Sequence, residues 1–129
     1  MVQLSGRYQL TNNVNYLEFM LKAGIPEDKA KKANDSNVVC SVTVDDQKFV
    51  MTNEGSNQQT SLEFDKENIE KHPLGLEAKS TASKQGNVIT VSSIYNGENY
   101  KRTYTFSEAG MEAIITHEAM EAKRIFKRL

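Results

Sequence analysis

The sequence predicts a mainly β fold, in which many short strands follow two short helices. Runs such as NVVCSVTV (37–44), KFVMTN (48–53) and TSLEF (60–64) are rich in β-branched or aromatic residues. Acidic residues and glycines separate these runs, and Asn96-Gly97 lies between two further runs, NVITVSSIY and YKRTYTF. Asn-Gly in such a position is the strongest short hairpin signal in a sequence. Many short strands with turn signals between them predict a sandwich or a barrel.

The first element is a short strand-like piece, GRYQLT (6–11), and a helical pattern follows it over residues 12–35. Gly24 is a suitable stop for one helix, and Pro26 is a suitable first residue for a second. The second helix is mostly charged, so we expect it to lie on the surface. The first helix has an apolar stripe at helical spacing, which consists of Tyr16, Phe19, Met20 and Ala23.

The later strands do not have one clearly apolar face. A dry sandwich core would hold mainly valine, leucine and isoleucine, whereas these faces mix aromatic residues with arginine and serine. A barrel around a solvated cavity explains such faces. A sheet face that covers the outside and meets solvent is an equally open alternative. The faces in question carry Tyr100, Arg102, Tyr104 and Phe106 in one run, and Ile89, Val91, Ser93 and Tyr95 in the other.

The last nine residues, EAKRIFKRL (121–129), fit two structures. As a helix they place four apolar side chains on one stripe, and their composition favours a helix. As a strand they place Arg124, Phe126 and Arg128 on one face. The local pattern leaves both open, and tight turns predicted at 84–86 and 107–110 extend the strand series towards this segment.

Length and composition suit one domain over residues 1–129, and the formal net charge of -1 gives no global sign of a nucleic-acid binder. We see no signal peptide and no transmembrane stretch, and the single cysteine, Cys40, cannot form an internal disulfide. We therefore expect a reducing, cytoplasmic location.

The N-terminal segment resembles the signature of the intracellular lipid-binding proteins, which include the fatty-acid-binding and retinoid-binding proteins. The segment FMLKAGIPEDKAKKAND and the tail KRIFKRL are similar to the liver and ileal members. Leu17 departs from the pattern, because the family usually has an acidic residue there. The matching positions are Gly6, Tyr8, Leu10, Asn15 and Tyr16, followed by Phe19, Met20 and Ala23.

This resemblance implies an all-β fold, a ten-stranded antiparallel up-and-down barrel (a β-clam) capped by a two-helix lid. It also implies that the tail is a strand with Arg124 pointing inward. The implied function is that of a non-enzymatic, monomeric carrier of a long-chain fatty acid, with the carboxylate held by interior arginines. Two alternatives stay open: a carrier of bulkier ligands such as bile acids, retinoids or acyl-CoA, and a barrel that docks on membranes or proteins with an incidental ligand.

Two departures from the family affect the expected head-group site. The last strand often has Arg-x-Tyr, but here Phe126 has no hydroxyl. A second inward arginine is common where this chain has Tyr104, whereas Arg102 lies two residues earlier on the same face. The site could be rebuilt from Arg124, Tyr104 and Arg102, or the head group could bind differently.

We expect the alkyl chain to lie against an apolar wall, and a lysine cluster on the second helix to contact anionic membrane. His72 and His117 are isolated, so we expect no metal site, and we find no cofactor motif and no catalytic constellation. The predicted wall consists of Tyr16, Met20, Phe49, Met51, Ile89, Val91, Ile115 and Phe126, and the lysines are Lys29, Lys31 and Lys32.

Overall fold

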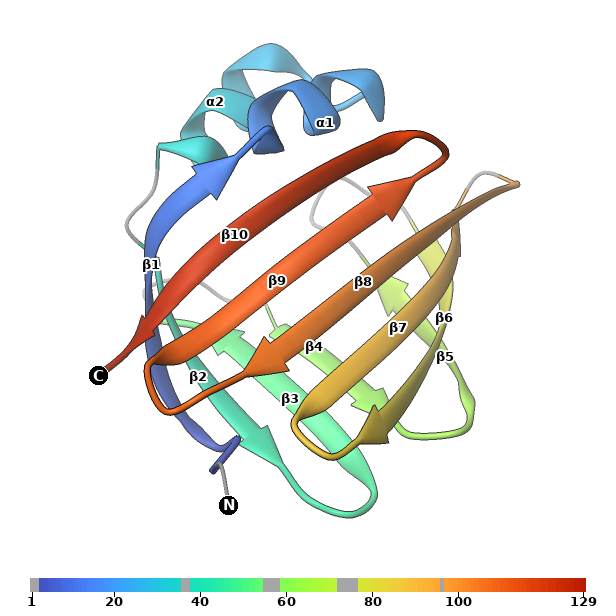
Figure 1. The fold of residues 1–129 in the computed structure, drawn as a ribbon. Coiled ribbons are helices and arrows are strands. Elements are labelled where there is room, and N and C mark those ends of the chain that lie inside the picture. Colours follow the sequence, from blue (N-terminus) through green and yellow to red (C-terminus); the bar gives the residue numbers. More distant parts are fainter. Residues whose placement is uncertain (1–2, 36–37, 55–58, 72–76, 96) are drawn as a thin grey trace.

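The structure is a computed structural model, and it describes residues 3–35, 38–54, 59–71, 77–95 and 97–129. Ten strands and two helices follow one another along the chain, and the two helices lie together over one end of the strands (Figure 1). The elements are β1 (Gly6–Val14), α1 (Tyr16–Lys22), α2 (Glu27–Asn34), β2 (Val39–Val44), β3 (Lys48–Asn53), β4 (Gln59–Glu63), β5 (Glu67–Lys71), β6 (Glu77–Gln85), β7 (Val88–Tyr95), β8 (Glu98–Phe106), β9 (Gly110–His117) and β10 (Met120–Arg128).

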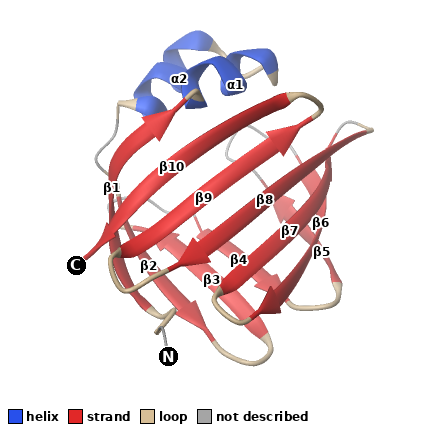
Figure 2. Cartoon of the chain, in the orientation of Figure 1, coloured by secondary structure: helices blue, strands red, loops and turns tan. Residues whose placement is uncertain are grey.

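All ten strands belong to one sheet, in the order β4-β3-β2-β1-β10-β9-β8-β7-β6-β5. The sheet curves round on itself, so that β1 pairs with β10 and the predicted barrel forms (Figure 2). The barrel is nearly closed, since within the described residues β4 and β5, the two edge strands, form no ladder with each other. The residues that follow β4 instead contact β6, through an isolated bridge between Phe64 and Ala82 and a hydrogen bond from the Asp65 amide to the Ala82 carbonyl (2.8 Å).

The helical lid follows the local sequence signals. Phe19 and Met20 on α1 are buried, whereas the neighbouring residues Glu18 and Leu21 are exposed, as the apolar stripe predicts. Gly24 adopts a positive φ of 91°, which ends α1 at low cost because glycine has no side chain to clash. Pro26 is the N-cap of α2.

The strand register decides which side chains face the interior. Arg102 pairs with Val91 and Ile115, and Tyr104 pairs with Ile89 and Ala113, so these residues share one face of the sheet. Ile89, Val91 and Tyr104 are almost fully buried. The alternative in which this face covers the outside and meets solvent is therefore wrong.

The C-terminal segment is a strand. β10 pairs with β9 over its whole length and with β1 on its other side, so its backbone groups bond to neighbouring strands. The helical alternative is wrong because these ladders supply tertiary pairing that outweighs local helix propensity. β10 approaches β9 closely at Gly110, where a Cβ atom would lie 2.0 Å from the carbonyl oxygen of Phe126.

The residues alone did not predict β5 or β6, which only the family resemblance implied. Their sequences, ENIEK and EAKSTASKQ, are too polar to look like strands. The inward positions of β6 carry small side chains, since Ser80 and Ala82 are fully buried. Small inward residues leave room inside the barrel for long side chains from neighbouring strands.

Candidate functional site

Arg124 lies on the inner face of β10, at the point where β1 leads into the lid. Its Nε donates a hydrogen bond to Asn13 Oδ1 (3.0 Å), and its Nη1 lies 3.4 Å from Tyr16 Oη. The guanidinium carbon lies 4.3 Å from the ring centroid of Tyr16 and 5.8 Å from that of Phe126. Arg124 is half-buried, so its charge is only partly screened by water.

A bulge in β1 creates this arrangement. Leu10 pairs with Phe126, but Asn12 pairs with Ile125, so the register shifts by one residue between them. Asn13 therefore lies opposite Arg124. The Asn13 side chain also donates from Nδ2 to the carbonyl oxygen of Asn34 (2.8 Å), at the end of α2. The arginine is thus connected to both helices of the lid, through Tyr16 and through Asn13.

The second inward arginine, Arg102, meets a carboxylate of the protein itself. Arg102 Nη2 donates to Glu70 Oε1 on β5, and the same nitrogen lies 3.3 Å from Ser93 Oγ. Ser80 Oγ also donates to Glu70 and lies 2.8 Å from Ser93 Oγ. Burial lowers the pKa of the Arg102 guanidinium, but Tyr104 and Glu70 raise the pKa by more, so the group stays charged.

Sequence reasoning missed Glu70, because it lies 32 residues from Arg102 in a strand that the residues did not predict. Two acidic residues on the neighbouring strands β9 and β10, Glu112 and Glu121, point elsewhere. Glu112 forms an ion pair with Lys123 (3.7 Å), in which both side chains are about two-fifths exposed, and Glu121 is exposed. Glu112 therefore faces outward, on the opposite face of β9 from the buried Ala113.

The predicted apolar wall divides into a packed part and a more open part. Phe49 on β3 contacts Tyr104 on β8, with ring centroids 5.1 Å apart, although these strands are not neighbours in the sheet. This contact crosses the barrel, so the interior is packed at that level. Phe49, Ile89, Val91, Phe126 and Met20 are buried, whereas Met51, Ile115 and Tyr16 are partly exposed.

The packed level lies at the end of the barrel away from the lid. Along β8 the inward residues are Tyr100, Arg102, Tyr104 and Phe106. Tyr100 contacts Phe19 of α1 (6.3 Å between centroids), whereas Phe106 contacts Tyr8 (5.8 Å). The polar groups of Arg102 therefore lie between the lid and this apolar floor.

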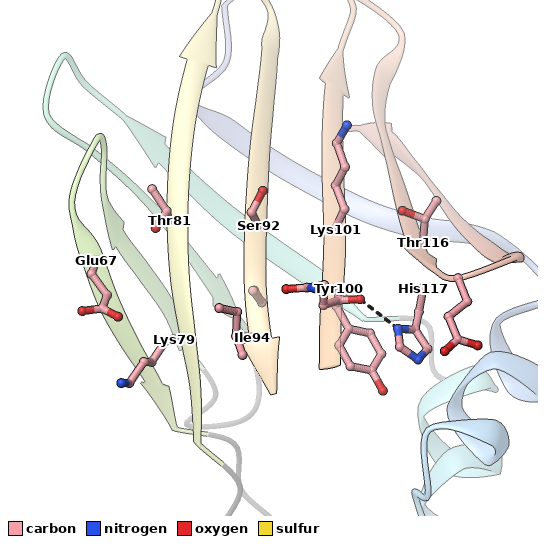
Figure 3. Close-up of a pocket in the computed structure, with 12 residues that line it drawn as sticks. Glu67, Lys79, Thr81, Ser92, Ile94, Tyr100, Lys101, Thr116 and His117 are labelled. Carbon is pink, nitrogen blue, oxygen red and sulfur yellow. Dashed lines mark hydrogen bonds between the residues drawn. The ribbon is translucent and has the colours of Figure 1, made fainter. Parts of the chain in front are cut away.

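A different pocket, of about 390 Å³, lies on the outside of strands β5 to β9 (Figure 3). Thr81, Ser92, Lys101 and Thr116 form one row across four paired strands and are part of its lining. These four residues alternate with the inward ones, whereas Ser93 and Tyr100, which also line the pocket, stand at inward positions of their strands. Its lining includes the exposed side chain of Ile94 as well as polar and charged side chains.

His117 borders this outer pocket and is less isolated than expected. Its ring stacks on Tyr100 (4.1 Å between centroids), and Nδ1 lies 2.8 Å from the Asn99 carbonyl oxygen (Figure 3). Ligand atoms of His117, Glu98 and Glu118 lie within 4.8 Å of one another, so they could hold a cation, but both glutamates are exposed. His72 lies outside the described residues.

The remaining predicted residues lie on the surface or in the core. Lys29, Lys31 and Lys32 are all exposed on α2, and Lys31 pairs with Glu27 (2.9 Å). Cys40 is buried, and its Sγ lies 3.1 Å from Asn53 Oδ1. Burial raises the pKa of this thiol to about 11. None of the described helices is long and apolar enough to cross a membrane.

Known proteins share both the sequence pattern and the fold. A family model described as the lipocalin / cytosolic fatty-acid binding protein family matches residues 2–129. Gastrotropin of Sus scrofa is 24% identical over 97% of this chain and 97% of its own length. The intestinal fatty acid-binding protein of Rattus norvegicus is 28% identical over 95% of this chain and 96% of its own.

A solved structure agrees with the fold. The Schistosoma mansoni fatty acid binding protein in complex with arachidonic acid superposes with a TM-score of 0.86. The two chains are 21% identical, and the match covers 98% of this chain and 96% of the other. At this identity the likeness demonstrates the barrel architecture alone.

Proposed function

This chain belongs to the lipocalin / cytosolic fatty-acid-binding protein family, whose members are non-enzymatic lipid carriers, and we propose that it binds a long-chain fatty acid inside its barrel. In this proposal the carboxylate of the acid binds Arg124, and the alkyl chain lies against the inward apolar residues. We further propose that the chain acts as a cytoplasmic monomer, in which Cys40 stays reduced.

The position of Arg124 is the observation that carries the proposal. A guanidinium binds a carboxylate with two parallel hydrogen bonds, which makes arginine the preferred partner for such head groups. Arg124 faces the interior, and its contacts include Asn13 and the Tyr16 hydroxyl, two neutral groups that a carboxylate can join or displace. The Tyr16 hydroxyl and the Asn13 amide can also donate hydrogen bonds to the acid.

The alkyl chain supplies most of the binding free energy in this proposal. Fifteen methylene groups at about 0.8 kcal/mol each give roughly 12 kcal/mol of gross transfer free energy. The translational, rotational and conformational freedom that the ligand loses on binding offsets a large share of this transfer free energy. A net free energy of about -8 to -11 kcal/mol corresponds to Kd values from micromolar to about ten nanomolar.

Native mass spectrometry of the purified chain, with extraction of the lipid that copurifies, tests this function. We expect a long-chain fatty acid. A retinoid, bile acid or acyl-CoA would support the carrier of bulkier ligands instead. A chain that neither copurifies with lipid nor takes up added fatty acid would support a barrel that docks on membranes or proteins.

The lid offers a route for exchange with membranes. Lys29, Lys31 and Lys32 place three cations on one exposed helix, although the pairing of Lys31 with Glu27 offsets part of this charge. Each lysine near an anionic bilayer contributes about 1 kcal/mol, and salt screens the attraction. We propose that this face contacts anionic membrane while the lid opens.

A further inference from the structure

Four polar side chains form a connected cluster inside the barrel, apart from Arg124. They come from four consecutive strands in the sheet, β5 to β8. Ser80 and Ser93 lie in register on β6 and β7, while Glu70 on β5 and Arg102 on β8 reach them diagonally. Hydrogen bonds connect the cluster in a ring, since Glu70 accepts from Arg102 and Ser80, and the two serines bond to each other.

The cluster is interior rather than a surface ion pair. Ser80 is fully buried and Ser93 is 7% exposed. The side chains of Arg102 and Glu70 are each only 20% exposed. Charges that are this far from water interact strongly, and one charge left without the other would be costly. The pair therefore stabilises both ions, and together they carry no net charge.

We propose that Glu70 determines where an acidic ligand binds, because it occupies Arg102 and so keeps this arginine from the carboxylate of the ligand. A carboxylate that approached Arg102 would have to displace Glu70 or lie beside a like charge. Ser80 Oγ also donates to the Glu70 oxygen that accepts from Arg102, which holds the carboxylate in place. This inference rests on the proposed function, and it identifies Glu70 as a specificity residue that contacts no ligand atom itself.

The test compares a twelve-carbon acid with the matched alcohol, dodecanoate with dodecanol. The ratio of their Kd values isolates the contribution of the carboxylate, because the alkyl chain is shared. We would measure this ratio by displacement of a fluorescent fatty-acid analogue from the wild type, Glu70→Gln, and the double variant Glu70→Gln/Arg102→Gln. Glu67→Gln is the matched control, because Glu67 lies on the same strand but is exposed.

In Glu70→Gln, Arg102 loses its carboxylate partner and becomes available to the acid. We expect the preference for acid over alcohol to rise at least tenfold, and Glu67→Gln to keep the wild-type ratio. The double variant removes both charges and should return the ratio to within about twofold of the wild type. An unchanged ratio in folded Glu70→Gln would overturn the proposal.

The double variant keeps the proposal testable even if the single variant does not fold. Replacing both members of a buried ion pair by neutral groups is often tolerated, whereas removing one is not. A tenfold loss of acid preference in the double variant would mean that Arg102 binds the acid in the wild type, and the proposal would be wrong.

Failure of this inference can be distinguished from failure of the proposed function. If the wild type binds none of dodecanoate, dodecanol and the longer acid hexadecanoate, the proposed function fails and the inference fails with it. If the wild type binds the acid and Arg124→Gln weakens that binding, the function stands whatever the Glu70 variants do. Urea unfolding of the same chains without ligand tests the ion pair itself. The urea concentration at the midpoint of unfolding should fall in Glu70→Gln and should rise again, at least in part, in the double variant.

Discussion

Replacing Arg124 with glutamine tests the head-group site most directly. Glutamine removes the charge but keeps a polar side chain that can still bond to Asn13, so the lid connection is disturbed as little as possible. Because Arg124 is half-buried and lies between two strands that remain fully paired, we expect the variant to fold. The change should therefore act on the ligand rather than on the barrel.

The expected loss follows from the hydrogen bonds of Arg124. A hydrogen bond to a charged group contributes about 1.5–3 kcal/mol. In the free chain Arg124 already donates to Asn13 Oδ1 (3.0 Å) and lies 3.4 Å from Tyr16 Oη. Exchange of one neutral hydrogen bond for the carboxylate offsets about 1 kcal/mol of this gain. We expect a net loss of about 0.5–2 kcal/mol, which is roughly 2- to 30-fold in Kd.

Titration calorimetry with dodecanoate and dodecanol measures this loss. The acid should bind Arg124→Gln more weakly by this factor, whereas the alcohol should bind both chains with nearly equal affinity. Lys127→Ala is the matched control, since Lys127 lies on the same strand and is exposed. Circular dichroism checks that each variant is folded.

Two results would refute the reasoning. If folded Arg124→Gln binds the acid with unchanged affinity, the carboxylate does not use Arg124. If acid and alcohol lose affinity equally, the substitution alters the shape of the cavity and the charge has no specific role.

Three further perturbations test the lid, the strand packing and the buried thiol. We expect the wild type to transfer ligand faster to anionic than to neutral vesicles, and reversing the charge of Lys29, Lys31 and Lys32 should abolish this difference while the equilibrium affinity stays nearly unchanged. Wild-type transfer rates that depend on neither lipid charge nor salt would exclude membrane contact. Gly110→Ala should lower the free energy of unfolding by about 1–3 kcal/mol or more, since the Cβ of the new alanine would lie 2.0 Å from a backbone carbonyl oxygen of β10. An unchanged midpoint of urea unfolding would contradict this close approach of the two strands. Burial raises the pKa of the Cys40 thiol from 9.0 to about 11, so the protonated thiol stabilises the folded state below pH 9 and this stabilisation is lost as the pH rises towards 11. The difference in unfolding free energy between the wild type and Cys40→Ala should therefore shrink between pH 9 and pH 11.

The sequence by itself determined most of the elements. Hydrophobic periodicity and turn chemistry are local, so they predicted the runs that became β2, β3, β4, β7 and β8, and the stripe of α1. The hairpin predicted around Asn96-Gly97 forms, since Tyr95 pairs with Glu98, although Asn96 itself lies outside the described residues. The family resemblance added the ten-stranded count and the lid.

Local signals were insufficient where tertiary pairing had the larger effect. The tail EAKRIFKRL has the composition of a helix, but ladders with β9 and β1 hold it as a strand. β5 and β6 carry few apolar residues, and they pair because the neighbouring strands supply partners for their backbone groups.

The arrangement of the site was decided in the same way. Alternation along the strand placed Arg102 on the same face as Tyr104 and Phe106, and the family resemblance implied that Arg124 points inward. Only the three-dimensional register brought Glu70, 32 residues away, to Arg102, and only the bulge between Leu10 and Asn12 placed Asn13 opposite Arg124. A shift of one residue moves every later side chain to the other face of a strand, and nothing in the local sequence specifies where that shift occurs.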